Sequence, residues 1–218
     1  MECVLCRAFL NEPSPWAVAR DGKEYFRCTI CDLVWMNPAQ RPAPEAELNR
    51  YLEHRNLIDD IAYLEYLARL AKPVCALISP EAKEKARGLD YGCGPSEGMR
   101  VVCEALGLRV TSYDPYFFPR TDLAPGSFQV LLCSEAAEHF FDPAKEFARI
   151  DSLVEKGGIL GFSTGLVRGR EEFLNWSYRR DPTHVIFFSE ACVNWLSAKF
   201  GWQLLQLEGP RFIFRKAG

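Results

Sequence analysis

The sequence predicts an α/β fold in which a doubly wound, mostly parallel sheet follows a small cysteine-rich segment and helices. From about residue 86 onward, short apolar runs alternate with amphipathic stretches, which is typical of parallel strands joined by helices. Near the N-terminus, four cysteines stand in two close pairs, and a proline-rich connector follows them. The connector predicts a domain boundary close to residue 40.

Composition narrows the class of protein before any motif is considered. The 218 residues are 48% hydrophobic and 25% charged, as expected of a globular chain. The 26 basic and 29 acidic residues give a formal net charge of −3, which argues against a nucleic-acid partner because phosphate binding needs a basic face. No apolar stretch approaches the roughly 20 residues that span a bilayer, so no membrane association is expected.

The number of cysteines indicates the redox compartment. There are nine of them, and five are scattered singly along the chain. An odd number excludes a complete set of disulfides. The first residues also lack a basic segment followed by an apolar run, the pattern of a secretory signal. We therefore expect a reducing, cytoplasmic location.

The two cysteine pairs predict a structural zinc site. Cys3 and Cys6 form one Cys-x-x-Cys pair, Cys28 and Cys31 form the other, and 21 residues separate the pairs. Four thiolates make the tetrahedral set that Zn²⁺ prefers and leave no open position for a catalytic water. A redox dithiol and unmetallated core cysteines are the alternatives. We expect residues 1–40 to form a zinc ribbon.

Residues 41–80 are expected to form a helical connector that could act as a lid. Within them, residues 61–71 carry apolar side chains at the i, i+3, i+4, i+7 spacing of a buried helical stripe. Asp59 or Asp60 could cap the start of this helix. We expect Pro73 to end it, because proline removes a backbone donor and clashes with the preceding turn.

Residues 81–218 contain the alternating pattern of the main sheet. The candidate strands are 87–91, 109–114, 128–133, 159–164, 203–208 and 211–215. The candidate helices are 98–106, 143–154 and 189–200. Only Gly209 and Pro210 separate the last two strands, so we expect them to form a C-terminal antiparallel hairpin.

A glycine-rich turn follows the first of these strands. Gly92 and Gly94 allow the chain to turn sharply and bring the backbone close to a ligand. Asp90 precedes the turn and Cys93 lies inside it. A dinucleotide-binding fingerprint would place its third glycine one position before Gly98, where this chain has a glutamate. A tight turn without a ligand is therefore the alternative.

The next strand ends in an acid at a spacing suited to a ribose. Asp114 lies 20 residues after Gly94 and precedes Pro115. A carboxylate there can accept hydrogen bonds from both ribose hydroxyls of a nucleoside. Together with the glycine-rich turn, it predicts a nucleoside-type ligand.

As a set, these motifs resemble those of the class I S-adenosylmethionine-dependent methyltransferases. Residues 89–94 are similar to the first motif of this family, and residues 113–115 to its ribose-binding strand. Residues 133–143 resemble its segment after the fourth strand, and residues 154–158 the turn before the fifth. A bacterial group of the family, and in part its sugar-modifying members, carry a similar N-terminal four-cysteine segment. The resemblance covers about residues 86–215.

The resemblance implies a Rossmann-like methyltransferase sheet with S-adenosylmethionine as the cofactor. The residues implied to bind this cofactor are Asp90, Gly92, Cys93, Gly94, Gly98, Asp114, Pro115, Cys133 and Glu135. One departure concerns the family's third strand, because only 13 residues separate Asp114 from Phe128. This strand, and the acid that often reads adenine there, are expected to be shortened or absent, with Asp122 as a substitute acid.

Two histidines are candidates for chemistry at the methyl acceptor. His139 follows the fourth strand of the family, on the side of the sheet where ligands bind; the alternative is a helix-start histidine bonded to the backbone. His184 lies within residues 181–189, which look like a motif of the zinc-bearing group, and is the better candidate for a base or acceptor contact. His54 is expected on a helix surface or in packing.

The sequence therefore predicts transfer of a methyl group from S-adenosylmethionine to a small-molecule or carrier-linked acceptor. Residues 168–181 combine arginines with aromatic side chains, which suit an anionic or planar acceptor or form a solvated lid. A ribosomal or transfer RNA methyltransferase is one alternative, which the acidic net charge disfavours. A non-catalytic cofactor-binding module that acts through a partner is the other.

Overall fold

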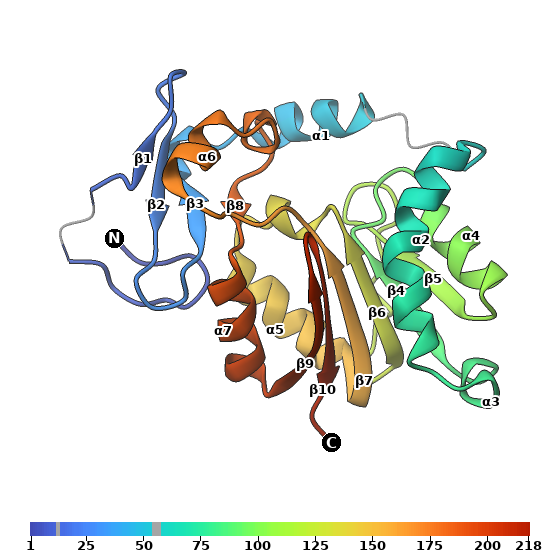
Figure 1. Ribbon diagram of the computed structural model, residues 1–218. Helices are drawn as coiled ribbons and strands as arrows, with labels where there is room; N and C mark the ends of the chain where they lie inside the picture. The colour runs from blue at the N-terminus through green and yellow to red at the C-terminus, as the bar shows by residue number, and fades with distance from the viewer. Residues whose placement is uncertain (12–13, 54–57) are drawn as a thin grey trace.

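A six-stranded sheet forms the centre of the chain, with strand order β5-β4-β6-β7-β10-β9 (Figure 1). The computed structural model describes residues 1–11, 14–53 and 58–218, so His54 lies outside the described residues. The parallel strands are β4 (Arg87–Tyr91), β5 (Arg109–Tyr113), β6 (Phe128–Ser134) and β7 (Val154–Ser163). The antiparallel hairpin consists of β9 (Trp202–Glu208) and β10 (Arg211–Lys216). The predicted fold class is confirmed.

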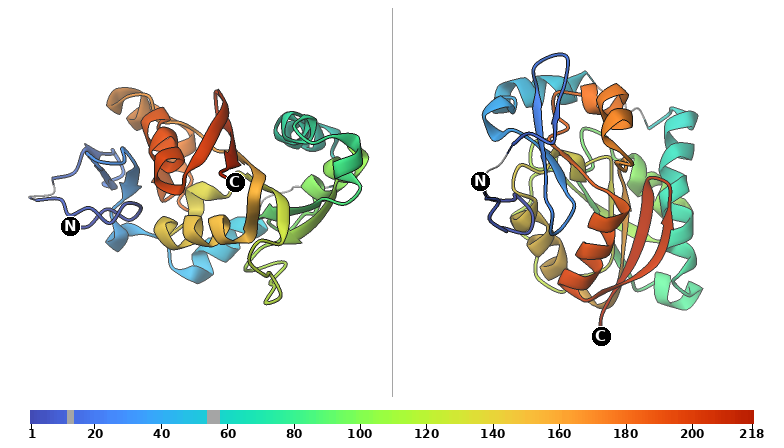
Figure 2. Two further views of the ribbon diagram at one scale, coloured as in Figure 1. Left: turned by 90° about the horizontal axis from the view of Figure 1, so that it is seen from below. Right: turned by 60° about the vertical axis from the view of Figure 1, so that its left-hand side comes forward.

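Helices cover both faces of this sheet (Figure 2). One face is covered by α2 (Ile61–Ala76) and α4 (Gly98–Ala105), and the other by α5 (Pro143–Leu153) and α7 (Glu190–Phe200). Side chains alternate along β6 between the two layers: Leu131 and Cys133 join the core under α5 and α7, whereas Val130 and Leu132 join the core under α2 and α4. This two-residue period is the geometry of an extended strand buried on both sides.

The cysteine-bearing segment builds a second, smaller sheet. Its strands are β1 (Ala17–Val18), β2 (Glu24–Arg27), β3 (Val34–Met36) and β8 (Ile186–Phe187), in that order. β8 comes from the insertion before α7 and pairs antiparallel with β3, Val34 opposite Phe187 and Trp35 opposite Ile186. All four of these side chains are fully buried. The N-terminal segment therefore shares both a sheet and a core with the second half of the chain.

A helical connector leads from the small sheet to the large one. α1 (Pro44–Leu52) begins at a proline, and Asp60 caps α2 by accepting hydrogen bonds from the backbone N–H groups of Ala62 and Tyr63. The expectation that Pro73 ends this helix is wrong, because α2 continues to Ala76. Val74 lies in the helix beyond the proline and is fully buried. Its burial against the sheet offsets a cost of about 3 kcal/mol for an internal proline.

The short elements complete the chain. They are η1 (Pro38–Gln40), α3 (Pro80–Lys83), η2 (Ala137–His139), α6 (Arg170–Asn175) and η3 (Tyr178–Arg180). In the described part of the chain, β5 is the edge of the large sheet, as expected for a missing third strand. None of the helices in those residues combines the length and the apolar character needed to cross a bilayer.

Candidate active site and metal centre

A cavity of about 800 Å³ lies at the carboxyl ends of β4, β5 and β6. Its wall also includes residues of α1 and α2, which precede the large sheet in the sequence, and residues of the loop before β8. This is the edge at which parallel sheets bind their ligands, and the volume suits a ligand of nucleoside size or larger. The predicted residues that line it are Gly92, Cys93, Gly94, Asp114, Pro115, Glu135, His139 and His184.

The glycine-rich turn is held by the backbone and by one carboxylate. Gly92 and Gly94 have positive φ values of 83° and 63°, which glycine adopts without steric cost. A Cβ added to Gly92 would lie 2.5 Å from the Cβ of Ala136. The N–H of Gly94 donates to Oδ2 of Asp114 at 3.0 Å, and Oδ1 accepts from the next turn, at the N–H groups of Tyr116 and Phe117. Three of about four acceptor positions on this carboxylate are thus used, which leaves capacity for a ribose hydroxyl.

Three of the predicted cofactor residues lie behind the wall of the cavity. Asp90 is 3% exposed and Cys133 is fully buried. Burial, and then the charges of Asp114 and Glu97, raise the pKa of Asp90 to about 8. Gly98 begins α4, and a Cβ there would come within 3.0 Å of two α2 side chains. The structure does not bring these residues to the cavity surface. Asp122 also lies elsewhere, with its side chain 72% exposed and paired with Arg120.

A carboxylate on α1 lines the cavity near Asp114. Glu47 is buried and accepts hydrogen bonds from the hydroxyls of Tyr51 and Tyr116, at 2.7 and 2.8 Å. Tyr116 follows Asp114 by two residues, so this contact ties α1 to the turn that would hold a ribose. The ring of Tyr51 also meets the ring of His139 edge-on, with 5.2 Å between centroids. The sequence pattern gave no sign of this role for Glu47.

Two glutamates share a tyrosine near the histidines: Glu135 is partly buried and lines the cavity, whereas Glu138 is fully buried. The hydroxyl of Tyr178 lies 3.1 Å from Oε2 of Glu135 and 2.6 Å from Oε1 of Glu138. Burial, and next the charge of Glu138, raise the pKa of Glu135 to about 7, and burial raises the pKa of Glu138 to about 7. One hydroxyl hydrogen can serve only one carboxylate, so a further proton or cation is favoured here. Tyr66 also donates to Glu135, at 2.7 Å.

Backbone carbonyls orient both candidate histidines. Nδ1 of His139 lies 3.0 Å from the carbonyl oxygen of Thr183, and Nδ1 of His184 lies 2.8 Å from that of Tyr178. Because a carbonyl oxygen only accepts, each Nδ1 carries a proton, and in the neutral form of the ring the lone pair is then on Nε2. The ring centroids are 4.8 Å apart. His139 therefore satisfies both interpretations, since it is bonded to the backbone and lines the cavity.

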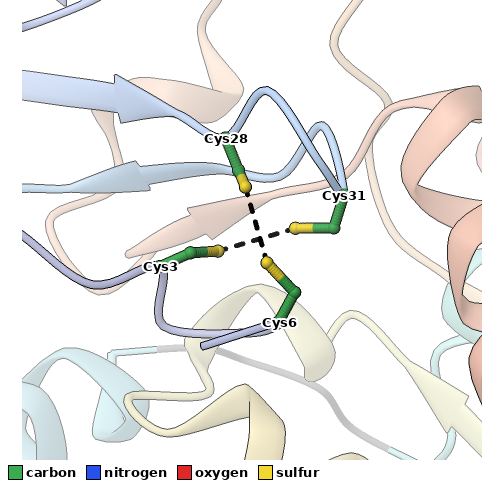
Figure 3. A group of neighbouring side chains, drawn as sticks. All are labelled: Cys3, Cys6, Cys28 and Cys31. Carbon is green, nitrogen blue, oxygen red and sulfur yellow. Dashed lines mark hydrogen bonds between the residues drawn. The ribbon is translucent and has the colours of Figure 1, made fainter. Parts of the chain in front are cut away.

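The four predicted metal ligands converge on one point (Figure 3). The Sγ atoms of Cys3 and Cys31 are 3.5 Å apart, those of Cys6 and Cys28 are also 3.5 Å apart, and all four lie within 4.8 Å of one another. A zinc tetrahedron with Zn–S bonds of about 2.3 Å has sulfur–sulfur edges of about 3.8 Å. The donor set and its spacing fit Zn²⁺.

The two cysteine pairs also have the same local turn. Arg7 and Asp32, the residues after Cys6 and Cys31, adopt positive φ values of 61° and 60°. Arg7 donates its N–H to the carbonyl of the first cysteine of its pair at 3.1 Å, and Asp32 does the same in the other pair. The N–H of Ile30 donates to a sulfur, Sγ of Cys28, at 3.4 Å. Such N–H groups stabilise thiolates in a closed metal site.

Comparisons with known proteins agree with this architecture. A family model described as a methyltransferase domain matches residues 63–207, which include the glycine turn and both histidines. The chain is 31% identical over 80 residues to the ubiquinone biosynthesis O-methyltransferase of Sodalis glossinidius (strain morsitans). That match covers 37% of this chain and 32% of the relative, so this chain spans about a third of the relative's length.

Two solved structures share the fold. One is the 1,6-didemethyltoxoflavin-N1-methyltransferase of Burkholderia thailandensis, solved with 1,6-didemethyltoxoflavin and S-adenosylhomocysteine. It has a TM-score of 0.53 at 16% identity, and the match covers 95% of this chain and 100% of that chain. The methyltransferase in the complex with the Trm112 activator of Haloferax volcanii has a TM-score of 0.52 at 11% identity, over 79% of this chain and 98% of that chain. The family match spans more than half of the sequence and contains most of the residues that line the cavity, so the chain belongs to the methyltransferase-domain family.

Proposed function

We propose that this protein transfers a methyl group from S-adenosylmethionine to an oxygen atom of a small-molecule or carrier-linked acceptor. One observation carries the proposal: a single cavity is lined both by the glycine turn with Asp114 and by the two histidines. Methyl transfer needs this arrangement, because cofactor and acceptor must meet in line in a site that excludes water. The curated relative is an O-methyltransferase, which favours oxygen as the attacked atom.

The cofactor end would hold the nucleoside by the backbone and by Asp114. The remaining acceptor capacity of this carboxylate would bind a ribose hydroxyl, while the turn at Gly92 and Gly94 allows close backbone approach. Bound S-adenosylmethionine supplies a methyl group that is already electrophilic. The bound S-adenosylhomocysteine of the Burkholderia thailandensis neighbour supports this choice of cofactor.

The histidine end would face the acceptor. In the neutral rings the lone pair is on Nε2, so His184, and next His139, could accept the proton of an acceptor hydroxyl. His184 is 9% exposed and its Nε2 lies 3.9 Å from Oε1 of Glu138. A carboxylate at that distance would stabilise the imidazolium that forms when the proton is taken.

The remaining parts would have supporting roles. Residues 1–40 would form the ribbon around a structural Zn²⁺, residues 41–80 the lid, and residues 81–218 the cofactor-binding domain. The nine cysteines are unpaired by disulfides in the structure, which is compatible with the proposed cytoplasmic location. An activating protein partner is a second candidate, favoured only by the likeness to the methyltransferase in the Trm112 complex.

Calorimetric titration with S-adenosylmethionine, S-adenosylhomocysteine and NADH tests the proposal. We expect micromolar binding of both sulfur nucleosides and none of NADH, because the third glycine of the dinucleotide fingerprint is absent. Binding of NADH alone would overturn the cofactor assignment. A folded protein that binds none of the three would overturn the proposed function.

A further inference from the structure

A second group of potential metal ligands lies at the wall of the cavity, far from the cysteines in sequence: His139 and His184 line the cavity, and Glu138 next to them is fully buried. One ligand atom from each of Glu138, His139 and His184 lies within 4.8 Å of the others. Two imidazoles with one carboxylate form a ligand set that binds divalent transition metals while leaving coordination positions open. The carboxylate and one imidazole are adjacent in sequence, on η2, and the other imidazole comes from the loop before β8.

The histidine geometry is that of metal ligands. A metal-bound histidine almost always donates its second ring N–H to a carbonyl or a carboxylate, which fixes the ring and its tautomer. Both His139 and His184 place Nδ1 within hydrogen-bond distance of a backbone carbonyl, at 3.0 and 2.8 Å. In the neutral form of each ring the lone pair is then on Nε2, and both residues line the cavity.

The carboxylate supplies an independent observation. Glu138 is fully buried, and its Oε1 accepts the hydroxyl of Tyr178 at 2.6 Å. Its Oε2 is also buried but has no hydrogen-bond partner among the described residues. A buried carboxylate oxygen without a partner is costly unless a cation compensates it. The orphan atom belongs to the same side chain that completes the histidine pair.

The surrounding charge also favours a cation. Glu135 and Asp181 line the same cavity, and Glu135 is linked to Glu138 through the hydroxyl of Tyr178. Arg50 pairs with Asp181 through two hydrogen bonds and with Glu53, which does not line the cavity, through a third. In the described residues no lysine or arginine forms an ion pair with Glu135 or Glu138, and one basic side chain near them is His184, whose Nε2 lies 3.9 Å from Oε1 of Glu138.

We propose that Glu138, His139 and His184 bind a divalent metal cation whose open coordination positions face the cavity and hold an oxygen of the acceptor. The oxygen-binding role rests on the proposed function; the binding of the cation does not. A cation there lowers the pKa of a bound hydroxyl. With the Nε2 lone pairs on the cation, neither histidine can act as the base in this state, so the cation takes over the activation of the hydroxyl. The hydroxyl proton passes to water, the oxygen forms its bond to the methyl carbon, and the carbon–sulfur bond breaks with its electron pair remaining on sulfur.

Titration of the zinc-loaded protein with MnCl₂, without cofactor, tests the site directly. Mn²⁺ suits imidazole and carboxylate better than thiolate, so it reports on this cluster rather than on the cysteines. We expect one Mn²⁺ per chain by calorimetry, with a matching loss of free-ion signal by electron paramagnetic resonance. If no Mn²⁺ binds even at high MnCl₂ concentration, the proposal is overturned, and a proton rather than a metal cation would compensate the unpartnered Oε2 of Glu138.

Variants assign the ligands. Glu138→Gln and His184→Ala should each weaken Mn²⁺ binding by about tenfold or more, the scale seen when a metal's supporting groups are lost. The matched control is Glu146→Gln, a carboxylate of the same cavity outside the cluster, which should keep Mn²⁺ affinity. Equal affinity in all three variants would overturn the assignment, provided circular dichroism shows each to be folded.

Parallel titration with S-adenosylhomocysteine separates the two proposals. Nucleoside binding without Mn²⁺ binding would overturn the metal site and leave the proposed function in place. Mn²⁺ binding without nucleoside binding would overturn the proposed function and retain the metal site.

Discussion

Arg50 donates two hydrogen bonds to a single carboxylate oxygen of Asp181, from Nε at 3.0 Å and from Nη2 at 2.8 Å. Asp181 also accepts from the backbone N–H and the hydroxyl of Thr183, at 3.0 and 2.6 Å. Burial opposes ionisation of Asp181, but the hydrogen bonds from Arg50 and Thr183 hold its pKa well below the usual range. The pair joins α1, which covers the cavity, to the loop that carries His184.

Breaking this pair should loosen the cover of the cavity. We expect Arg50→Ala to lower the free energy of unfolding by about 1 kcal/mol, because the arginine is partly exposed and exposed charge pairs contribute little. It should also raise the amide exchange rate across α1. Urea unfolding and hydrogen exchange measure both effects. Arg50→Lys keeps the positive charge but cannot donate from two nitrogens of one guanidinium, so it should give an intermediate result. Unchanged amide exchange in both variants would contradict the connection between α1 and the loop that carries His184.

The carboxylate of Asp114 should be required for nucleoside binding. We expect Asp114→Ala to weaken S-adenosylhomocysteine binding by about 1–3 kcal/mol, because a ribose hydroxyl and the N–H of Gly94 both lose their acceptor. Asp114→Asn retains one acceptor oxygen and should lose less. Calorimetry on both variants measures the difference. Wild-type affinity in Asp114→Ala would remove this residue from the site.

The two glycines of the turn should differ in their tolerance of alanine. Both have positive φ, so either substitution strains the backbone by about 1 kcal/mol. Only at Gly92 would the new methyl group collide with Ala136, since nothing lies within 4 Å of a Cβ at Gly94. Gly92→Ala should therefore unfold at a clearly lower urea concentration than Gly94→Ala. Equal urea midpoints for the two variants would contradict this prediction and show that the backbone can shift to accommodate the methyl group at position 92.

Asp90 should make the stability of the protein depend on pH. Burial raises the pKa of this acid in the folded state to about 8, against about 4 in the unfolded chain. The unfolded state therefore loses its proton first, and Asp90 lowers stability progressively between about pH 4 and pH 8. Asp90→Asn removes this effect, so its stability relative to wild type should rise across that range. Urea unfolding at several pH values checks this, and a constant difference would contradict it.

Removal of the proposed zinc ion from the cysteine cluster should affect two distant parts of the sequence. β3 and β8 belong to one sheet, so chelation should increase amide exchange in residues 1–40 and also at Ile186 and Phe187. Exchange in β6 and β7 should change little. Hydrogen exchange with mass spectrometry before and after chelation measures this. Protection of β8 in the metal-free protein would contradict the coupling.

The large sheet could be predicted from the sequence because its signals are local. Each parallel strand is a short apolar run followed by a helical pattern, and Gly209 with Pro210 marks the final hairpin. The glycine turn and Asp114 could also be predicted, since the spacing between strand ends fixes where their backbones meet. The cysteine cluster followed from ligand type and pairing alone.

Contacts between distant segments could not be predicted in this way. β8 has only two residues, too few to show a period, so its pairing with β3 left no signal. A strand that is buried on both faces shows no alternation of polar and apolar residues, so its sequence does not tell which side chains point toward the cavity. This is why Cys133 was expected in the cavity but lies behind its wall. The shared hydrogen bonds of Tyr178 depend on a loop conformation that no local pattern encodes.

The pairing of β3 with β8 determines how this protein can be divided or recombined. A cut after residue 40 would leave Ile186 and Phe187 with an unpaired edge and expose the apolar surface now covered by Val34 and Trp35. Exposed edges of this kind favour aggregation. A chimaera that borrows the cysteine segment would therefore need to import the loop around β8 from the same parent, and the two pieces should be inherited together.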